Sequence, residues 1–558
     1  AFSTSCQYAV LNAIVNYTRE ARWTNMLRTL YFALLICLQG QHLMAAEPET
    51  VTTYQGEVRG TWADAAGSIQ VFKGLPYARP PVADLRWVAP QAPEKWTGVR
   101  AAIEPGPACW QESQLEQFVW SRGKFERSED CLYLNIWSRI EQAKQPVMVW
   151  FHGGSHTSGM SHDTIFDGAT LASQGVVVVT VNYRLGPFGF LAHPALAAES
   201  SHNSAGNYGL LDKIAALNWV RDNIAQFGGD PDNVTIFGQS AGSQSVCALM
   251  ASPLSKGLFH KAIGQSASCT QPTKTIDANG FDRGRRLAQA LVKKNTVDAE
   301  TLRGAPPQVI MRAANKSRWA AQSRIVVDGW VVPEPVDNIY LAGQQAGIPL
   351  MVGSLANEGH LLFPLNEDLD SAELQTAIEK LAGNHAGALL ELYADEAAQS
   401  PGLAQRAIAT DLFMAYGMRR WADHQRAAGA PVFLYHFDHT PPAFRLYVPD
   451  NPDLKLPDGP RSAGAYHSAD LAYVFGNVDK VGLDWQEEDR QLSRTMVRFW
   501  TNFAKSGDPN QPEHQGLPEW RPYDRKTHAT MLLNSNPHTT EGVRAAKLDI
   551  WDEVFSTD

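Results

Sequence analysis

Val234-Thr235-Ile236-Phe237-Gly238-Gln239-Ser240-Ala241-Gly242 is the stretch that decides the fold class of this 558-residue chain. A β-rich run leads directly into the pattern Gly-x-Ser-x-Gly, and residues 243–250 can form a helix. A serine on a sharp strand-to-helix turn needs small residues two positions away, because bulk there would collide with neighbouring backbone. The non-catalytic alternative is a glycine-rich turn whose serine only caps a helix. In this context the pattern favours Ser240 as a nucleophile.

Other β-rich runs also end close to residues that are candidates for an active site. They span 147–151, 176–181 and 348–352, and the first and last lead to His152-Gly153-Gly154 and Asn357-Glu358-Gly359. Strands that alternate with helices predict an α/β fold whose mostly parallel sheet is covered by helices on both faces. Ligands gather at the carboxyl ends of such strands. One helix is indicated by apolar residues at helical spacing, namely Leu211, Ile214, Leu217, Val220, Ile224 and Phe227.

The composition limits the partners and the number of domains. The formal net charge is −10, and no basic run is long enough to follow a phosphate backbone, which argues against a nucleic-acid partner. No linker, charge block or internal repeat divides the chain. We therefore expect one domain over 47–558, with large insertions around the active site, and the oligomeric state stays open.

The first 46 residues differ from the rest. Residues 1–25 are expected to lie upstream of the true start and outside the fold. From Met26 onward, Arg28 precedes the apolar run 30–38 and a polar stretch that ends in Ala45-Ala46, which is the order of a secretory signal peptide. The apolar run is too short for a bilayer, which needs about 20 residues. We expect a cleaved signal peptide over 26–46, no stable membrane anchor, and a secreted or periplasmic protein.

The six cysteines are consistent with an exported protein. Two precede the expected cleavage site, and four remain. No Cys-x-x-Cys pair exists, which argues against a zinc site or a thioredoxin-like site. Structural disulfides are favoured over reduced core cysteines. The cysteines are Cys6, Cys37, Cys109, Cys131, Cys247 and Cys269.

A serine nucleophile needs a base, an acid that orients the base, and an oxyanion hole. The oxyanion hole of such a fold uses the N–H of the residue after the nucleophile and N–H groups from a glycine-rich loop. Here these are Ala241 together with Gly153 and Gly154, directly after an apolar strand. The chain offers 16 histidines as bases. His436 and His439 could also pass for a metal pair, but they lie on a strand-like segment without further ligands.

Several stretches resemble the type-B carboxylesterase family. The nucleophile signature covers 227–242, and a second signature covers Glu129 to Trp137. Further family-like stretches are 72–78, 207–212, 464–467 and 473–476, and the similarity extends from about residue 50 to the C-terminus. This resemblance implies the α/β-hydrolase fold, hydrolysis of small-molecule carboxylic esters, and no cofactor.

The resemblance also assigns roles to individual residues. It makes Glu358 the acid and His467 the base, in preference to His360, which stands too near Glu358 to reach a third residue. It gives Ser266 a hydrogen bond to the acid and pairs Cys109 with Cys131. A bridge between Cys247 and Cys269 has no such support, but both could approach the acyl pocket. Three departures from the family pattern, at Gln239, Asn357 and Ala267, bear on substrate preference.

The sequence thus predicts an esterase with a Ser240–His467–Glu358 triad, an acyl-enzyme intermediate and no metal. The alternatives are a non-catalytic adhesion or binding protein on the same fold, an amidase and a lipase. A binding protein of this family typically lacks a triad residue, whereas all three are present here.

Overall fold

The computed structural model describes residues 48–558 apart from several segments. The expected upstream segment and signal peptide, 1–25 and 26–46, lie outside the described residues, as do Cys6 and Cys37. The other segments left out are 113–124, 271–275, 278–279, 293–296, 320–324, 361, 364, 443–460, 462, 482–483, 513–515 and 557–558.

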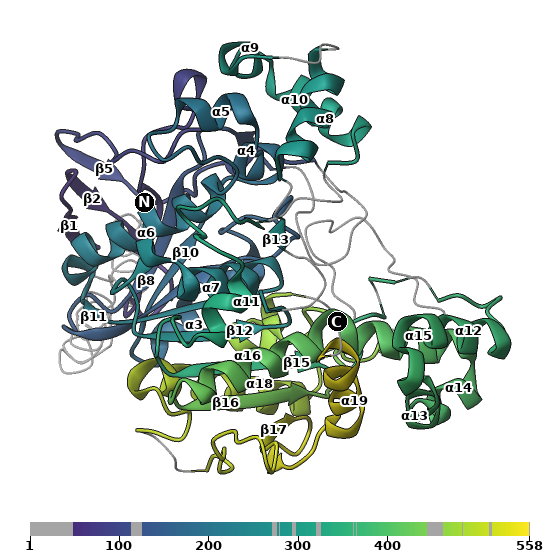
Figure 1. Ribbon diagram of the computed structural model, residues 1–558. Coiled ribbons are helices and arrows are strands. Elements are labelled where there is room, and N and C mark those ends of the chain that lie inside the picture. Colours follow the sequence, from purple (N-terminus) through teal and green to yellow (C-terminus); the bar gives the residue numbers. More distant parts are fainter. Residues whose placement is uncertain are drawn as a thin grey trace, which may run out of the picture.

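An eleven-stranded sheet forms the centre of the described chain (Figure 1). The strands from β17 to β10 run parallel, and antiparallel strands extend both edges. The predicted mostly parallel sheet is therefore confirmed. In spatial order its strands are β18 (His538–Thr540), β17 (Thr530–Leu533), β16 (Val432–Phe437), β15 (Leu350–Leu355), β12 (Lys261–Gln265), β11 (Gly229–Gln239), β9 (Gln145–Phe151), β10 (Val177–Val181), β8 (Tyr133–Ser138), β4 (Gln70–Pro76) and β3 (Thr61–Trp62).

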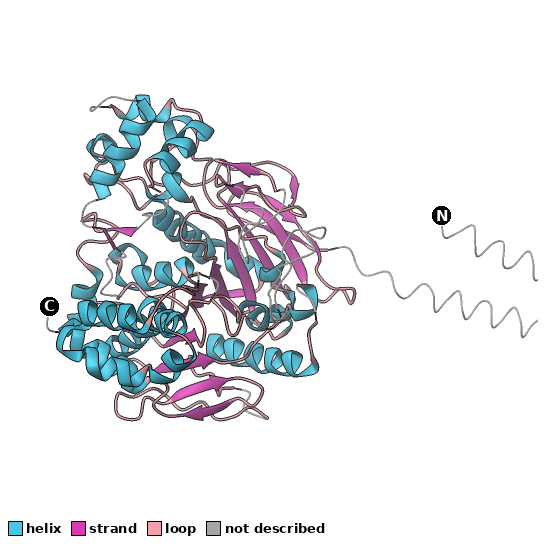
Figure 2. Cartoon of the chain, turned by 90° about the vertical axis from the view of Figure 1, so that its right-hand side faces the viewer, coloured by secondary structure: helices cyan, strands magenta, loops and turns pink. Residues whose placement is uncertain are grey.

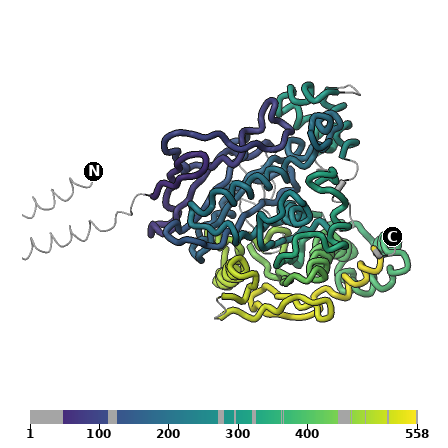
Figure 3. The backbone as a smooth tube through the Cα atoms, turned by 60° about the vertical axis from the view of Figure 1, so that its left-hand side comes forward, coloured from purple at the N-terminus to yellow at the C-terminus, as the bar shows by residue number. Residues whose placement is uncertain are grey.

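Short strands lie outside this sheet. One three-stranded sheet has the order β1 (Thr50–Thr52), β2 (Glu57–Arg59) and β5 (Val99–Ala101). The remaining pairs are β6 (Ala108–Cys109) with β7 (Arg127–Ser128), and β13 (Ile276–Asp277) with β14 (Ile325–Val326). The first strands and the last strands lie on opposite sides of the molecule (Figure 3).

The central strands are buried on both faces, which explains their continuous apolar runs. In β9, Val147 and Val149 pack into one core, whereas Met148 and Trp150 pack into the other. Helices cover the two faces (Figure 2). The first core contains side chains of α6 (Tyr208–Asn223), α7 (Ala241–Ala251), α11 (Val336–Leu341) and α16 (Tyr416–Ala427), and the second those of α3 (Ala169–Ser173), α17 (Leu471–Phe475) and α18 (Glu487–Ser506).

The insertions are helical and follow the carboxyl ends of strands. One group comes between β12 and β15, and another between β15 and β16, where it packs with α19 around a third core (Figure 1). None of the helices in the described chain is both long and apolar enough to cross a membrane. The remaining helices are α4 (Gly186–Phe190), α5 (Pro194–Glu199), α8 (Gly280–Val292), α9 (Ala299–Arg303), α10 (Pro307–Lys316), α12 (Ser371–Ala382), α13 (Ala386–Leu392), α14 (Ala394–Gln399), α15 (Pro401–Thr410) and α19 (Ala545–Ser556).

Candidate active site

Ser240 stands at the turn between β11 and α7. Its backbone has φ 56° and ψ −126°, a combination that costs energy for any residue with a Cβ. Ser240 is partly exposed, whereas Gln239 before it and Ala241 after it are buried. Its N–H donates to the carbonyl of Gln265 at the end of β12, at 2.8 Å. The turn therefore holds Ser240 at the carboxyl edge of the sheet.

The two glycines of the motif let this turn pack against β9. A Cβ on Gly242 would lie 1.9 Å from the carbonyl oxygen of Phe151. A Cβ on Gly238 would lie 2.6 Å from the carbonyl carbon of Gly242. Both distances are far below van der Waals contact, so the steric requirement expected for these glycines is confirmed.

Glu358 and His467 lie on loops that follow β15 and precede α17. Nδ1 of His467 is 2.6 Å from Oε2 of Glu358, whose Oε1 accepts the N–H of Leu355 at 2.9 Å. Both side chains are buried. In the neutral imidazole whose Nδ1–H donates to this carboxylate, Nε2 carries the lone pair. That atom lies 3.2 Å from Nε2 of Gln239, the residue before Ser240.

Asn357 joins the loop of Glu358 to the loop of His467. Its N–H donates to the carbonyl of Ala465 at 3.0 Å, and its Oδ1 accepts the N–H of Ala465 at 2.9 Å. A Cβ on Gly464, which has φ +65°, would lie 2.3 Å from that oxygen. His360 is turned to other partners, since its Nδ1 lies 3.2 Å from the carbonyl of Ala463.

The glycine-rich loop after β9 touches the turn that carries Ser240. A Cβ on Gly153 would lie 3.0 Å from Cβ of Ser240, and a Cβ on Gly154 would lie 2.1 Å from the carbonyl of Ser158. Within the described chain, the N–H groups of Gly153 and Gly154 donate to no other residue. Backbone donors beside a nucleophile can stabilise an oxyanion.

Side chains that stack on His152 support this loop. The ring of His152 lies on that of Tyr183, with centroids 4.4 Å apart, and the Tyr183 hydroxyl donates to the carbonyl of His152 at 2.6 Å. Nζ of Lys213 lies 3.0 Å from the centroid of the Tyr183 ring. Burial lowers the pKa of His152 to about 3, so the ring is neutral at physiological pH.

Comparisons with known proteins identify the family. A family model described as the carboxylesterase family matches residues 47–551. The chain belongs to this family. The para-nitrobenzyl esterase of Bacillus subtilis is 37% identical over 519 residues, which cover 87% of this chain and 95% of that protein. The human cocaine esterase is 34% identical over 562 residues, which cover 94% of each.

Solved structures agree with the α/β-hydrolase fold. The carboxylesterase of Geobacillus stearothermophilus superposes with a TM-score of 0.76 at 32% identity, over 90% of this chain and 99% of that chain. A para-nitrobenzyl esterase gives a TM-score of 0.73 at 34% identity, with the same coverage. The protein is therefore a carboxylic ester hydrolase of the serine hydrolase type.

The prediction that Ser266 forms a hydrogen bond with Glu358 is wrong. The hydroxyl of Ser266 has no hydrogen-bond partner in the described part of the chain. Ser266 is fully buried at the end of β12 with φ 52°, and its N–H donates to the carbonyl of Gly353 at 2.9 Å. The carboxylate of Glu358 is held instead by Leu355 and His467.

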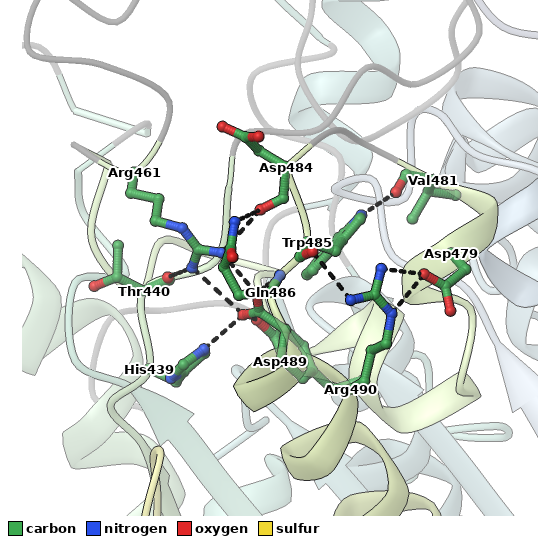
Figure 4. A network of polar contacts seen from close by, with 11 residues as sticks. His439, Thr440, Arg461, Asp479, Val481, Asp484, Trp485, Gln486, Asp489 and Arg490 are labelled. Atoms are coloured by element: carbon green, nitrogen blue, oxygen red, sulfur yellow. Dashed lines mark hydrogen bonds and ion pairs between the residues drawn. The ribbon is translucent and has the colours of Figure 1, made fainter.

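The histidines considered as a metal pair have other environments. Nε2 of His439 lies 2.7 Å from Oδ1 of Asp489, within a network of polar contacts (Figure 4). Burial, together with the charge of Arg544, lowers the pKa of His436 to about 3. Among the described residues, no group of three or more histidine, cysteine or acidic side chains could hold a metal ion.

Both expected disulfides are present. Cys109 and Cys131 have Cα atoms 5.0 Å apart, and Cys247 and Cys269 have Cα atoms 5.6 Å apart, each with an S–S bond of 2.05 Å. The second bridge connects α7 to the segment after β12 and is buried in the core. It therefore links the helix that starts after Ser240 to the segment that follows the neighbouring strand.

Sequence reasoning missed two features next to His467. Asp470 is fully buried on the same turn and accepts a hydrogen bond from Gln265. Phe413, which is 40% exposed, lies in the π-helical segment Asp411–Ala415, with its ring centroid 6.4 Å from that of His467. Only the partner of Asp470, Gln265, had a signal in the sequence, because Gly-Gln-Ser occurs at both 238–240 and 264–266. A π-helical segment has no such signature.

Proposed function

We propose that this esterase cleaves carboxylic esters through an acyl-enzyme on Ser240, with His467 as general base and Glu358 as the acid that orients it. The observation that carries the proposal is the position of the imidazole. One nitrogen is bonded to a buried carboxylate at 2.6 Å, and the other lies beside the strand end that bears Ser240.

The reaction has two halves. Nε2 of His467 takes the proton of Ser240 while its oxygen attacks the ester carbonyl, and Glu358 stabilises the imidazolium that forms. The tetrahedral intermediate collapses, the alcohol leaves with the proton from His467, and the acyl group stays on Ser240. A water molecule activated by His467 then releases the acid. No step needs a metal or an organic cofactor.

The oxyanion is held by backbone N–H groups. We assign this role to Gly153, Gly154 and Ala241, because the glycine loop contacts Ser240 and Ala241 begins α7. Such donors are fixed before the reaction, so no reorganisation is needed when the negative charge develops. Removal of a single donor of this kind typically lowers kcat by about 10²–10³-fold.

The nucleophile can be tested by covalent labelling. A fluorophosphonate probe should modify the wild type on Ser240, and Ser240→Ala should lose both the label and at least about 10³-fold of the turnover. Ser243→Ala is the matched control, because Ser243 lies on the same helix with its hydroxyl bonded to the carbonyl of Ala267. A Ser240→Ala protein with near-wild-type turnover would exclude this nucleophile.

The ester class is the next question. Relatives named for para-nitrobenzyl esters and for cocaine suggest that this chain also accepts small aromatic esters. A series of p-nitrophenyl esters with increasing acyl length should show a maximum of kcat/KM at short to medium chains. A maximum at long chains only in the presence of an oil–water interface would favour a lipase, and faster cleavage of the matching anilides would favour an amidase.

The two disulfides support an oxidising compartment. Such bridges persist in secreted and periplasmic proteins and are rare in a reducing cytosol. We therefore propose that the esterase is exported. Fractionation of the native host should find the activity outside the cytosol, and activity confined to the cytosol would contradict export.

A further inference from the structure

The same three-residue sequence lies at the carboxyl end of the nucleophile strand and of its neighbour. Gly238-Gln239 ends β11 and is followed by Ser240, and Gly264-Gln265 ends β12 and is followed by Ser266. The parallel register pairs Gln239 with Gln265, and the two serines share a left-handed backbone, with φ 56° and 52°. Paired residues on adjacent strands point to the same face of a sheet. Both glutamine side chains are fully buried.

Gln239 contacts the turn that carries the base. Its Nε2 lies 3.2 Å from Nε2 of His467 and 3.1 Å from Oγ of Ser468. One amide hydrogen can therefore meet the imidazole lone pair, and the other can meet the serine hydroxyl. Its Oε1 is buried and has no partner in the described chain. A rotated amide would present this oxygen to Nε2–H of a protonated imidazole.

Gln265 contacts the other end of the same turn. Its Nε2 donates to Oδ2 of Asp470 at 2.9 Å, and the hydroxyl of Tyr435 donates to the same oxygen at 3.2 Å. The indole N–H of Trp500 reaches Oε1 of Gln265 at 3.4 Å. Burial raises the pKa of Asp470 to about 6, the Gln265 hydrogen bond opposes this shift, and Glu358 adds to it.

We propose that Gln239 and Gln265 form a clamp of positioning residues that holds the turn 466–470, and with it the imidazole of His467, against the end of the nucleophile strand. This inference rests on the proposed function, because it acts through the base of that mechanism. Among the described residues, the titratable groups at this turn include Glu358 after β15, Tyr466 and Asp470 on the turn itself, and Tyr435 of β16 behind it. The clamp therefore adds neutral hydrogen-bonding groups to a site that already holds two carboxyl groups.

The clamp predicts a change in pH dependence for Gln239→Glu. The glutamate side chain has the same shape as glutamine, but its carboxylate can only accept a hydrogen bond. It therefore stabilises the protonated form of His467, which has an N–H to donate. The acid limb of the kcat/KM profile should move up by about one pH unit or more, because an opposite charge within 4–6 Å shifts a titration by about 1–3 units. Gln239→Met removes the amide without adding charge, and it should lower kcat about tenfold with KM and the acid limb unchanged, the size expected for one hydrogen bond.

Exchange of donor and acceptor in the hydrogen bond between Gln265 and Asp470 tests the role of Gln265. Gln265→Glu sets two carboxyl groups against each other and should lower kcat about tenfold or more. In the double variant Gln265→Glu/Asp470→Asn, an asparagine N–H can donate to the new carboxylate, so most of the lost kcat should return. Gln425→Glu is the matched control, because Gln425 is equally buried and its amide donates to the carbonyls of Ala346 and Ile348, both at 2.8 Å. It should lower the thermal midpoint and leave the acid limb in place.

The outcomes separate the clamp from the mechanism beneath it. A wild type that fluorophosphonate does not label on Ser240 would refute the proposed function and the clamp together. Normal labelling of the wild type, with an acid limb that Gln239→Glu leaves unmoved, would refute the clamp alone. A double variant no more active than Gln265→Glu, or an equal loss of kcat in Gln425→Glu, would also refute it.

Discussion

Gly242 lets α7, the helix after Ser240, pack closely against β9. The replacement Gly242→Ala would put a methyl group 1.9 Å from the carbonyl of Phe151, so α7 must shift away from the strand. The N–H of Ala241 and the side chain of Ser240 move with it. A shift of about 1 Å in a reacting group can cost about 10²-fold in rate, and we expect a loss of that order in kcat/KM.

Gly387 supplies the control for this prediction. It lies in helix α13, and a Cβ there would meet nothing within 4 Å. Gly387→Ala should keep the activity and not lower the thermal midpoint, since alanine is preferred over glycine in helices, by about 1 kcal/mol in their interior and less in the first turn, where Gly387 lies. Equal activity of the two alanine variants would contradict the steric role of Gly242.

Asn357 offers a second test at the scale of one residue. Its amide oxygen accepts the N–H of Ala465 and so joins the loops of Glu358 and His467. Asn357→Ala should lower kcat about tenfold, which corresponds to one hydrogen bond of about 1–1.5 kcal/mol. Asn357→Asp keeps the acceptor and should recover most of the loss. A fall of equal size in both variants would show that the acceptor oxygen is not what joins the loops.

At the scale of elements, Asp489 fastens the first turn of α18 to two other segments (Figure 4). Its carboxylate accepts hydrogen bonds from His439, from Arg461 at 2.6 Å and from the N–H of Gln486 at 2.7 Å. Burial alone would raise the pKa of Asp489, but the hydrogen bonds from His439 and Arg461 hold it well below its usual range. The carboxylate thus stabilises the folded state only while it is ionised.

This depressed pKa predicts a pH-dependent loss of stability in Asp489→Asn. The stabilisation is present above the unfolded pKa of an aspartate, near 4, and is lost as the pH falls below it. At pH 7 the variant should unfold more easily by about 3 kcal/mol, the lower range for a broken buried ion pair. The difference from the wild type in thermal midpoint should shrink toward pH 3.

A neighbouring aspartate provides the control for Asp489. Asp479 pairs with Arg490 at 2.8 Å, but its side chain is 66% exposed. Surface ion pairs contribute little because water screens them, so Asp479→Asn should leave the thermal midpoint nearly unchanged. If both variants lost the same stability at pH 7, the burial of Asp489 would not be the reason.

For the whole molecule, the bridge between Cys247 and Cys269 limits the freedom of the unfolded chain. The two residues are 22 positions apart, and closure of such a loop stabilises the fold by about 3 kcal/mol in the entropic model. The double variant Cys247→Ala/Cys269→Ala should therefore melt several degrees lower and keep its activity at 25 °C. A thermal midpoint equal to that of the wild type, with the Cys109–Cys131 bridge intact, would contradict this role.

Local sequence was sufficient for the elements that carry the nucleophile. The continuous apolar run of β9 and the β-rich lead into Gly238 are typical of strands buried on both faces, and the structure has them there. The predicted run 348–352 is shifted, since β15 spans Leu350–Leu355. Its last residues are set by pairing with β16, which lies about 80 positions further along the chain.

The sequence by itself determined the strand-turn-helix that bears Ser240, because the steric demand of that turn falls on residues two positions away in the same segment. Only the tertiary structure decided which groups surround His467. Asp470, Gln265 and Gln239 meet there because parallel pairing aligns the ends of β11 and β12. The absence of a bond from the Ser266 hydroxyl to Glu358 could not be predicted either, because the carboxylate is bonded instead to the nearby N–H of Leu355 and to His467, which is distant in sequence. Backbone sterics act between neighbours along the chain, whereas the hydrogen bonds of a buried site depend on which segments folding brings together.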